Sequence, residues 1–177
     1  VWLQLKVIAD IGIIGMPNAG KSSLLAAVTR ARPKIANYPF TTLDPNLGVS
    51  YYDNREVTLA DIPGLVEGAH EGVGLGDKFL RHIERCKILL HLIDVSGEKL
   101  TDNYLKIRKE LSKYGEILSK KKEIIVFNKS DLLEKKELNK KLKLFKSKIK
   151  KKFEIISVAT DANLTNLRKI LLKNAHK

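Results

Sequence analysis

The sequence has little cysteine and no long apolar run. One cysteine among 177 residues cannot form an intramolecular disulfide, which excludes a small fold held by disulfides. No run approaches the roughly 20 apolar residues of a membrane-spanning helix, and no basic-then-apolar leader opens the chain. We therefore expect a soluble, monomeric, cytoplasmic protein without a membrane span. The run DKFLRHIERC predicts Cys86 on one face of a helix, as a small packing residue.

The length and composition fit one domain. With 44% hydrophobic residues, 177 residues can bury one core but hardly two, so residues 1–177 are expected to form one domain. Because the chain opens at Val1 without a methionine, we expect it to be cut from a longer protein.

Positive charge is concentrated in the second half of the chain. Residues 1–100 carry 11 basic and 11 acidic side chains, so the formal net charge of +13 comes from the residues that follow. Much of it lies in 134–152, where apolar residues recur at helical spacing and lysines occupy the other faces. The apolar residues are Leu138, Leu142, Phe145 and Ile149. Such a helix can meet RNA phosphates, but charged faces are usually only solvated, and we prefer that interpretation.

Strand and helix patterns alternate along the chain. Val7 to Gly15 is a continuous β-branched run that suits a strand buried on both faces of a parallel sheet. A helix follows from near Gly20, and residues 47–64 indicate two strands around the turn pair Asp53-Asn54. Further strands are expected at 87–94, 123–128 and 153–158, and helices around 100–120, 134–152 and 164–174. This order predicts an α/β fold, a three-layer doubly wound, mostly parallel sheet of about six strands with about five helices.

A phosphate-binding loop lies between the first strand and the first helix. Residues Gly15-Met16-Pro17-Asn18-Ala19-Gly20-Lys21-Ser22 fit the pattern G-x-x-x-x-G-K-S. At this position backbone N–H groups and the helix dipole face a phosphate. Lys21 then places its charge between the β- and γ-phosphates, and the Ser22 hydroxyl can ligate Mg²⁺. The expected fold is therefore that of a P-loop NTPase.

A second motif predicts selectivity for guanine. Asn128-Lys129-Ser130-Asp131 follows a later strand, and the Asp131 carboxylate can accept hydrogen bonds from N1–H and the 2-amino group of guanine. Adenine offers neither donor in that arrangement, which disfavours an ATPase. Asn128 is expected to bridge loops and the Lys129 stem to cover the base. Backbone N–H groups of Ser157-Val158-Ala159 are expected to bind the guanine oxygen.

Two further segments predict loops that respond to the γ-phosphate. Asp61-Ile62-Pro63-Gly64 ends a strand with an acid that can hold Mg²⁺ through water and a glycine N–H that can sense the phosphate. Upstream, Thr41 or Thr42 can complete the Mg²⁺ shell, and the residues alone do not decide between them.

The chain resembles the Obg family of GTPases from end to end. The resemblance is carried by NYPFTTLDPNLG at 37–48 and DIPGLVEGAHEGVG at 61–74. It implies that Phe40, Thr41, Thr42, Leu43 and Asp44 contact nucleotide together with Asp61, Ile62, Pro63 and Gly64. It also implies Ser22 and Thr42 as Mg²⁺ ligands, a preceding glycine-rich domain, and a role in assembly of the large ribosomal subunit and its rRNA. The lysine-rich stretch 135–152 departs from the family pattern.

Catalysis needs a substitute for the water-orienting glutamine of many GTPases, because Leu65 follows the D-x-x-G motif. Besides Lys21, Thr42 and Gly64, we expect Asn18 to act, since its carbonyl oxygen can help to seat a K⁺ ion near the phosphates. Glu67 and His70 are interpreted as exposed loop residues. His91, inside an apolar strand, is interpreted as a core or interface residue.

Two functions stay open on the sequence. The first is a slow GTPase switch that binds GTP or GDP and acts in ribosome assembly. The second is a guanine-nucleotide-sensing module that binds RNA or the ribosome with little turnover. A tRNA-modification GTPase is disfavoured by the glycine-rich signature after Gly64.

Overall fold

The computed structural model describes residues 9–29, 34–35, 46–61, 83–113 and 115–176. The strands within these ranges are β1 (Ala9–Ile14), β2 (Lys34–Ile35), β3 (Asn46–Tyr52), β4 (Arg55–Asp61), β5 (Cys86–Asp94), β6 (Glu123–Asn128) and β7 (Phe153–Ile155). The helices are α1 (Lys21–Val28), α3 (Leu100–Lys113), α4 (Glu116–Lys120), α5 (Lys135–Ile149) and α6 (Leu164–Ala175), with a 3-10 turn η1 (Ser130–Leu132).

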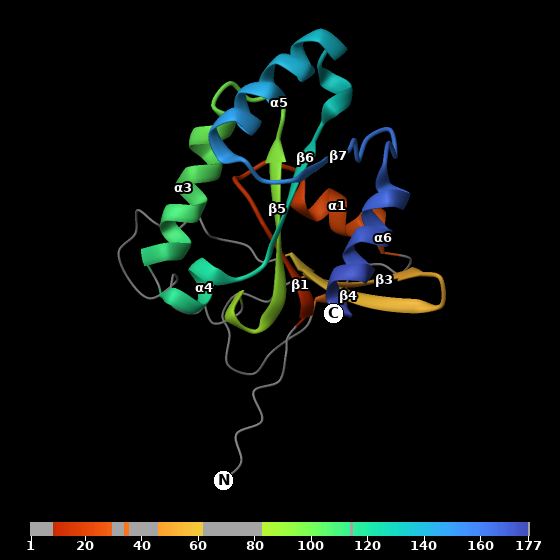
Figure 1. Ribbon diagram of the computed structural model, residues 1–177. Helices are drawn as coiled ribbons and strands as arrows, with labels where there is room; N and C mark the ends of the chain where they lie inside the picture. Colours follow the sequence, from red (N-terminus) through yellow and green to blue (C-terminus); the bar gives the residue numbers. More distant parts are fainter. Residues whose placement is uncertain (1–8, 30–33, 36–45, 62–82, 114, 177) are drawn as a thin grey trace.

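The described strands form one sheet in the order β2-β3-β4-β1-β5-β6-β7. β3 is antiparallel to β2 and β4, whereas every other neighbouring pair is parallel. Helices cover both faces, which makes three layers (Figure 1). The predicted doubly wound α/β fold is confirmed, and the short β2 is added to the expected strands.

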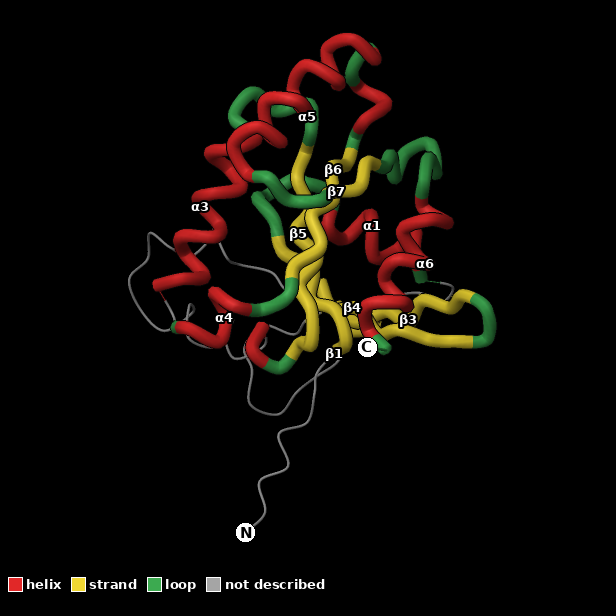
Figure 2. Tube along the Cα trace, in the orientation of Figure 1, coloured by secondary structure: helices red, strands yellow, loops and turns green. Residues whose placement is uncertain are grey.

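The two faces of the sheet bury separate sets of apolar side chains. On one face, residues such as Leu24 of α1 and Leu167 of α6 pack on alternate positions of the central strands. On the other face, α3, α4 and α5 cover the sheet through residues such as Leu111, Leu118 and Phe145. Figure 2 shows the strands between these two groups of helices. The central strands are apolar on both faces because helices cover both.

The β3–β4 hairpin turns as predicted. Asp53 and Asn54 have φ angles of 52° and 55°, the left-handed conformation that short polar side chains tolerate. The expected helical stretch 100–120 is instead divided into α3 and α4, with Gly115 at φ 138° before α4. No described helix is both long and apolar enough to span a bilayer.

The prediction of Cys86 on a helix is wrong. Cys86 begins β5 and pairs with Ala9 of β1, because the strand starts earlier than the apolar run alone indicates. Its expected packing role is confirmed, since the thiol is buried in the apolar cluster that includes Leu89 and Leu111. This burial raises the pKa of Cys86 to about 12, so the group stays a neutral thiol.

Candidate nucleotide-binding site

The candidate site lies at the carboxyl edge of the sheet. β4, β1, β5 and β6 run parallel, so the loops that follow them meet at the same edge. Asp61 of β4 pairs with Ile13 of β1, and Asp94 of β5 pairs with Asn128 of β6. The sheet register therefore brings together motifs that are far apart in the sequence.

The phosphate loop connects β1 to α1 in the conformation that its glycines permit. Gly20 has a φ of 94°, and a Cβ atom there would lie 2.6 Å from Nδ2 of Asn128. A Cβ atom on Gly15 would collide with the carbonyl oxygen of Leu92. Asn18 also adopts a left-handed conformation, with φ at 61°. The loop thus needs glycine both for its backbone conformation and for its close approach to neighbouring strands.

The Lys21 side chain folds back over the loop. Its ammonium group donates to the carbonyl oxygens of Gly15 at 3.2 Å and Met16 at 3.1 Å. These bonds hold the positive charge beside the start of α1, where the helix dipole also favours an anion. The contact of Lys21 with the phosphates stays a prediction.

Ser22 and Asp61 form the acidic end of the site. The Ser22 hydroxyl donates to Oδ2 of Asp61 at 2.5 Å. Asp61 is only 5% exposed, and its Oδ1 atom has no hydrogen-bond partner within the described part of the chain. A buried carboxylate oxygen without a partner is costly, and a cation or water would satisfy it.

Asn128 bridges two loops, as predicted. Its Nδ2 group donates to the carbonyl of Ala19 at 3.0 Å, and its Oδ1 atom accepts from the N–H of Val158 at 3.1 Å. Asn128 is 2% exposed, and the bond to Ala19 is buried while the bond from Val158 is partly buried. The residue therefore joins the phosphate loop to the loop after β7.

Lys129 is held by an acid that the sequence analysis missed. Its Nζ atom lies 2.6 Å from Oδ2 of Asp94, whose Oδ1 atom accepts from the N–H and hydroxyl of Ser96. Burial would raise the pKa of Asp94, but the bonds from Lys129 and Ser96 outweigh it and lower that pKa. Asp94 ends β5, so the rule that ligand loops follow parallel strands was a signal that pointed to it.

Asp131 receives its hydrogen bond from a side chain. The Ser157 hydroxyl donates to Oδ1 of Asp131 at 2.5 Å, and the Thr160 N–H donates to the same hydroxyl oxygen at 3.2 Å. Asp131 is exposed at the surface of η1. This bond orients the carboxylate that we predicted to recognise guanine.

Two of the three backbone N–H groups that we expected to bind the guanine oxygen already donate to other groups of the protein. The Ser157 N–H donates to the Ala162 carbonyl at 3.2 Å, and the Val158 N–H already donates to Asn128. These two N–H groups are therefore engaged within the protein. The Ala159 N–H makes no hydrogen bond with the described residues, so it can bind a guanine oxygen without breaking one.

Several predicted site residues lie outside the described residues. They are Phe40, Thr41, Thr42, Leu43, Asp44, Ile62, Pro63 and Gly64, together with Leu65, Glu67 and His70.

His91 is a core residue, in agreement with the sequence interpretation. It is 1% exposed, and its Nδ1 atom lies 3.0 Å from Oε1 of Glu123. Its ring stacks on Tyr104 of α3, with 5.0 Å between the ring centroids. It faces the layer of α3 and not the nucleotide edge.

Comparisons with known proteins identify the family of the chain. A family model described as 50S ribosome-binding GTPase matches residues 10–129. GTPase Obg of Pelagibacter ubique is 62% identical over 160 residues, covering 90% of this chain and 48% of that protein. GTPase Obg of Ehrlichia canis is 55% identical over all 177 residues, or 52% of its own length. The chain thus spans about half the length of these curated relatives, and the resemblance to the Obg family is confirmed.

Solved structures share the fold at low sequence identity. The crystal structure of a variant of Aquifex aeolicus Era bound to GDP.AlF4- has a TM-score of 0.70 and 22% identity, covering 94% of this chain and 56% of that chain. The G domain of the T. maritima FeoB iron transporter has a TM-score of 0.64 and 22% identity, covering 93% and 97%. The fold is therefore that of a P-loop GTPase, and the family match over most of its length makes this chain a member of the 50S ribosome-binding GTPase family.

Proposed function

We propose that this chain binds GTP and hydrolyses it to GDP and phosphate with Mg²⁺, as a slow switch in assembly of the large ribosomal subunit. The observation that carries the proposal is the Asn128 bridge between the phosphate loop and the loop after β7. It joins the loop that we propose for the phosphates to the loop that we propose for the base. The family description and the name GTPase Obg of the relatives support the same activity and the ribosomal partner.

Guanine recognition follows from the orientation of Asp131. With its Oδ1 atom bonded to Ser157, the exposed carboxylate keeps oxygen lone pairs for the two N–H donors of guanine. Adenine would leave the carboxylate without those donors, at a cost of about 1–3 kcal/mol for each unmade bond. Lys129 precedes Asp131 by two residues in the chain, and its ammonium group is held by Asp94. Its stem then supplies an apolar surface for the base.

The residues at the acidic end suit Mg²⁺. A serine hydroxyl next to a buried carboxylate offers oxygen ligands, and Oδ1 of Asp61 still needs a partner. No cluster of three acidic, histidine or cysteine side chains occurs among the described residues, but Mg²⁺ in nucleotide sites takes most of its ligands from phosphates and water. Ser22 would ligate the ion directly, with Asp61 acting through water and Thr42 completing the shell. When bound, Mg²⁺ neutralises charge on the β- and γ-phosphates.

Hydrolysis then requires a positioned water and stabilised charge. The water oxygen attacks the γ-phosphorus, the bond to the β–γ bridging oxygen breaks, and GDP leaves with that oxygen while the water proton passes to phosphate or solvent. Lys21 offsets the negative charge that develops on the leaving side. Leu65 cannot polarise water, so we expect the unassisted rate to be low.

Asn18 is the group that we propose for a second cation. It is exposed and held at a φ of 61° in the phosphate loop, so its amide lies at the surface of the loop. Its carbonyl oxygen, with phosphate oxygens and backbone carbonyls, would form a site for K⁺.

Single-turnover hydrolysis of GTP and of ATP, each with and without Mg²⁺, tests the proposal. We expect slow GTP turnover that needs Mg²⁺, and no turnover of ATP. Tight GTP binding without turnover, even when large-subunit precursors are added, would favour the sensing module. Equal binding of ATP and GTP would contradict the guanine assignment.

A further inference from the structure

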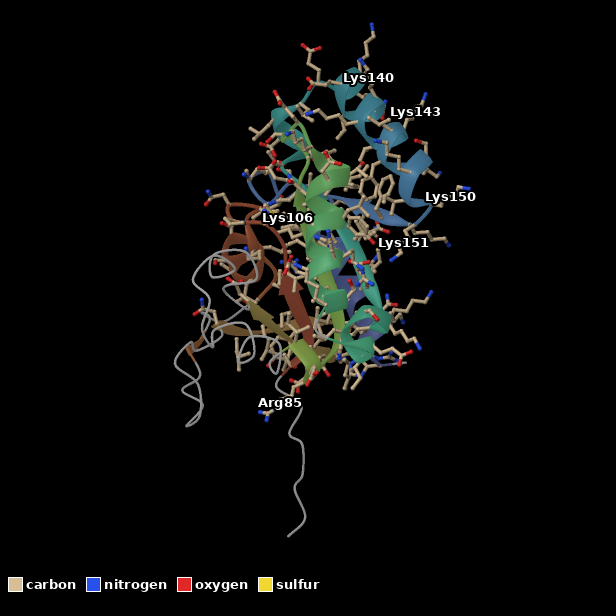
Figure 3. The ribbon with its side chains drawn as sticks, turned by 90° about the vertical axis from the view of Figure 1, so that its left-hand side faces the viewer. Arg85, Lys106, Lys140, Lys143, Lys150 and Lys151 are labelled. Carbon is tan, nitrogen blue, oxygen red and sulfur yellow. The ribbon has the colours of Figure 1, made fainter. Side chains whose placement is uncertain are left out.

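Helix α5 is amphipathic, and its outer face carries a row of lysines beside the exposed Leu144. Leu142 is 7% exposed and Phe145 1% exposed, so they fix the inward face against the sheet layer. A helix advances 100° per residue, which puts Lys136, Lys140 and Lys143 on the opposite face. All three are exposed, and Figure 3 shows Lys140 and Lys143 pointing away from the protein. We call these three residues the lysine stripe.

The stripe lysines differ from Lys141 and Lys151, which are paired with acids. Lys141 pairs with Glu137 at 3.5 Å, and Lys151 pairs with Glu123 at 3.1 Å. The three stripe lysines make no ion pair within the described residues. Several other lysines of the region also make no ion pair within the described part of the chain, namely Lys135, Lys146, Lys148, Lys150 and Lys152. Since like charges three or four residues apart on a helix repel each other, the stripe is held at an electrostatic cost that an external polyanion would relieve.

A membrane does not fit this surface. A helix that lies on a bilayer buries an apolar face among the lipids, whereas the apolar face of α5 is already buried in the protein. An acidic protein fits poorly too, because protein interfaces favour aromatic residues and arginine and are depleted in lysine. Point charges spaced along one line suit a regular row of phosphates, which lysine contacts without demanding one geometry.

We infer that the lysine stripe binds the phosphate backbone of RNA. Phosphate contacts of this kind set affinity and orientation and carry no sequence information, so the surface would dock structured RNA by shape and charge. This inference extends the ribosomal partner proposed above and rests on that proposal only for its biological setting.

An RNA bound to the stripe would lie close to the residues that we propose to bind guanine, because α5 contacts the loop that holds Lys129. Lys141 on the flank of α5 donates to the carbonyls of Val95, Ser96 and Gly97, at 3.4, 3.1 and 3.2 Å. That loop follows Asp94, the partner of Lys129. RNA on the stripe would therefore contact an element that is tied directly to the loop that holds Lys129.

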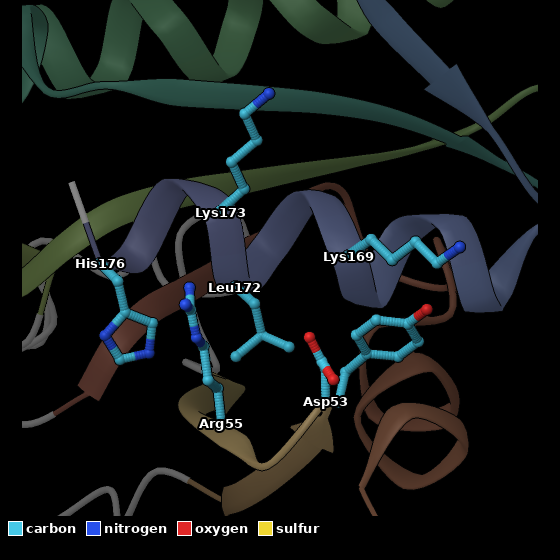
Figure 4. Close-up of a pocket in the computed structure, with 7 residues that line it drawn as sticks. Asp53, Arg55, Lys169, Leu172, Lys173 and His176 are labelled. Atoms are coloured by element: carbon cyan, nitrogen blue, oxygen red, sulfur yellow. The ribbon is translucent and has the colours of Figure 1, made fainter.

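The test compares two triple variants of the 177-residue chain. The first, Lys136→Gln/Lys140→Gln/Lys143→Gln, removes the stripe and keeps helix propensity, because glutamine and lysine are similar helix formers. The second, Arg55→Gln/Lys169→Gln/Lys173→Gln, removes the same charge from a groove of about 390 Å³ between the β3–β4 hairpin and α6 (Figure 4). Binding of a fluorescent 20-base-pair RNA duplex is measured from 50 to 200 mM KCl, with anionic phospholipid vesicles as the competing ligand.

We expect the stripe variant to bind RNA at least about tenfold more weakly, and the slope of log K against log salt to fall by about 2 to 3, or roughly one per lost contact. The groove variant should bind nearly as the unaltered chain does. Equal losses in both variants would show that only net charge matters and would overturn the inference. If the stripe variant lost vesicle binding but kept RNA binding, the inference would be overturned as well. Because RNA binding is measured without GTP hydrolysis, a failure of the proposed GTPase activity can be distinguished from a failure of the proposed RNA binding.

Discussion

The side-chain amide of Asn128 donates to the backbone carbonyl of Ala19 at 3.0 Å, across a sequence separation of 109 residues. Removing a hydrogen-bond donor costs the most stability when it leaves a buried acceptor without a partner. We therefore expect Asn128→Ala to lower the free energy of unfolding by about 1–3 kcal/mol, and to weaken GTP binding because the two loops lose their connection. Urea unfolding of the nucleotide-free chain measures the first effect. Asn139→Ala on the exposed face of α5 is the control and should change little.

Asp131→Asn is expected to exchange guanine for xanthine. An amide donates where the carboxylate accepted, so it clashes with the 2-amino group of guanine but suits the 2-oxo group of xanthine. Competition binding of GTP and XTP should show GTP affinity falling at least about 100-fold and XTP binding appearing, since guanine loses one hydrogen bond and two donors then face each other. A variant that loses both nucleotides equally would show that Asp131 is structural.

Much of the fold and part of the site could be predicted from the sequence. The continuous β-branched run before Gly15 and the turn pair Asp53-Asn54 have strong local preferences, so the strand and hairpin followed from them. Asn128 was assigned its bridging role from its motif. Such features are decided within a few residues of the chain.

Other features depend on partners that are distant in the sequence. Cys86 belongs to β5 because Ala9 pairs with it, and neither residue reveals this alone. The Ser157 hydroxyl donates to Asp131, whereas its N–H donates to the Ala162 carbonyl, and the motif alone shows neither contact. Asp94 has no motif of its own and becomes part of the site through Lys129.

Asp61→Asn is expected to remove the benefit of Mg²⁺ for nucleotide binding. The amide cannot offer two anionic oxygens, and its NH₂ group would oppose the Ser22 hydroxyl or the ion. GTP affinity measured with Mg²⁺ and with EDTA should differ for the unaltered chain and be nearly equal for the variant. Asp53→Asn in the hairpin turn makes the same chemical change away from the site and should keep the difference. A full Mg²⁺ effect in Asp61→Asn would contradict the assignment.

Asn18 is expected to make GTP turnover depend on K⁺. Single-turnover rates in KCl should exceed those in NaCl, and Asn18→Ala should abolish the difference because the carbonyl ligand is lost. Since Asn18 has a φ of 61°, alanine also strains the loop, so Asn18→Gly serves as the variant without that strain. Loss of the K⁺ effect in both variants supports the role of the side chain. Equal rates of the unaltered chain in the two salts would remove the hypothesis.

Glu123 is expected to make the protein sensitive to acid. Its side chain is 3% exposed, and it accepts from His91 and from the Tyr104 hydroxyl, each at 3.0 Å, and from Lys151 at 3.1 Å. Burial would raise the pKa of Glu123, but the hydrogen bond and charge of His91, with Arg108 and Lys151, bring that pKa down to about 2. The folded chain therefore resists protonation of this carboxylate at pH values where the unfolded chain accepts the proton.

The sign of the pH effect follows from that difference. Because the folded pKa lies below the ordinary value of 4.5, the stabilisation is complete above about pH 4.5 and disappears as the pH falls towards about 2. The loss is on the order of 3 kcal/mol for a shift of this size. Urea unfolding at pH values between 6 and 3 should show about 2 kcal/mol of this loss, because the rest falls between pH 3 and 2. Glu123→Gln should be less stable at pH 6 but lose less on acidification. Glu116→Gln, at an exposed pair with Lys120, should keep the pH dependence of the unaltered chain. Parallel pH curves for Glu123→Gln and the unaltered chain would assign the acid sensitivity to other carboxylates.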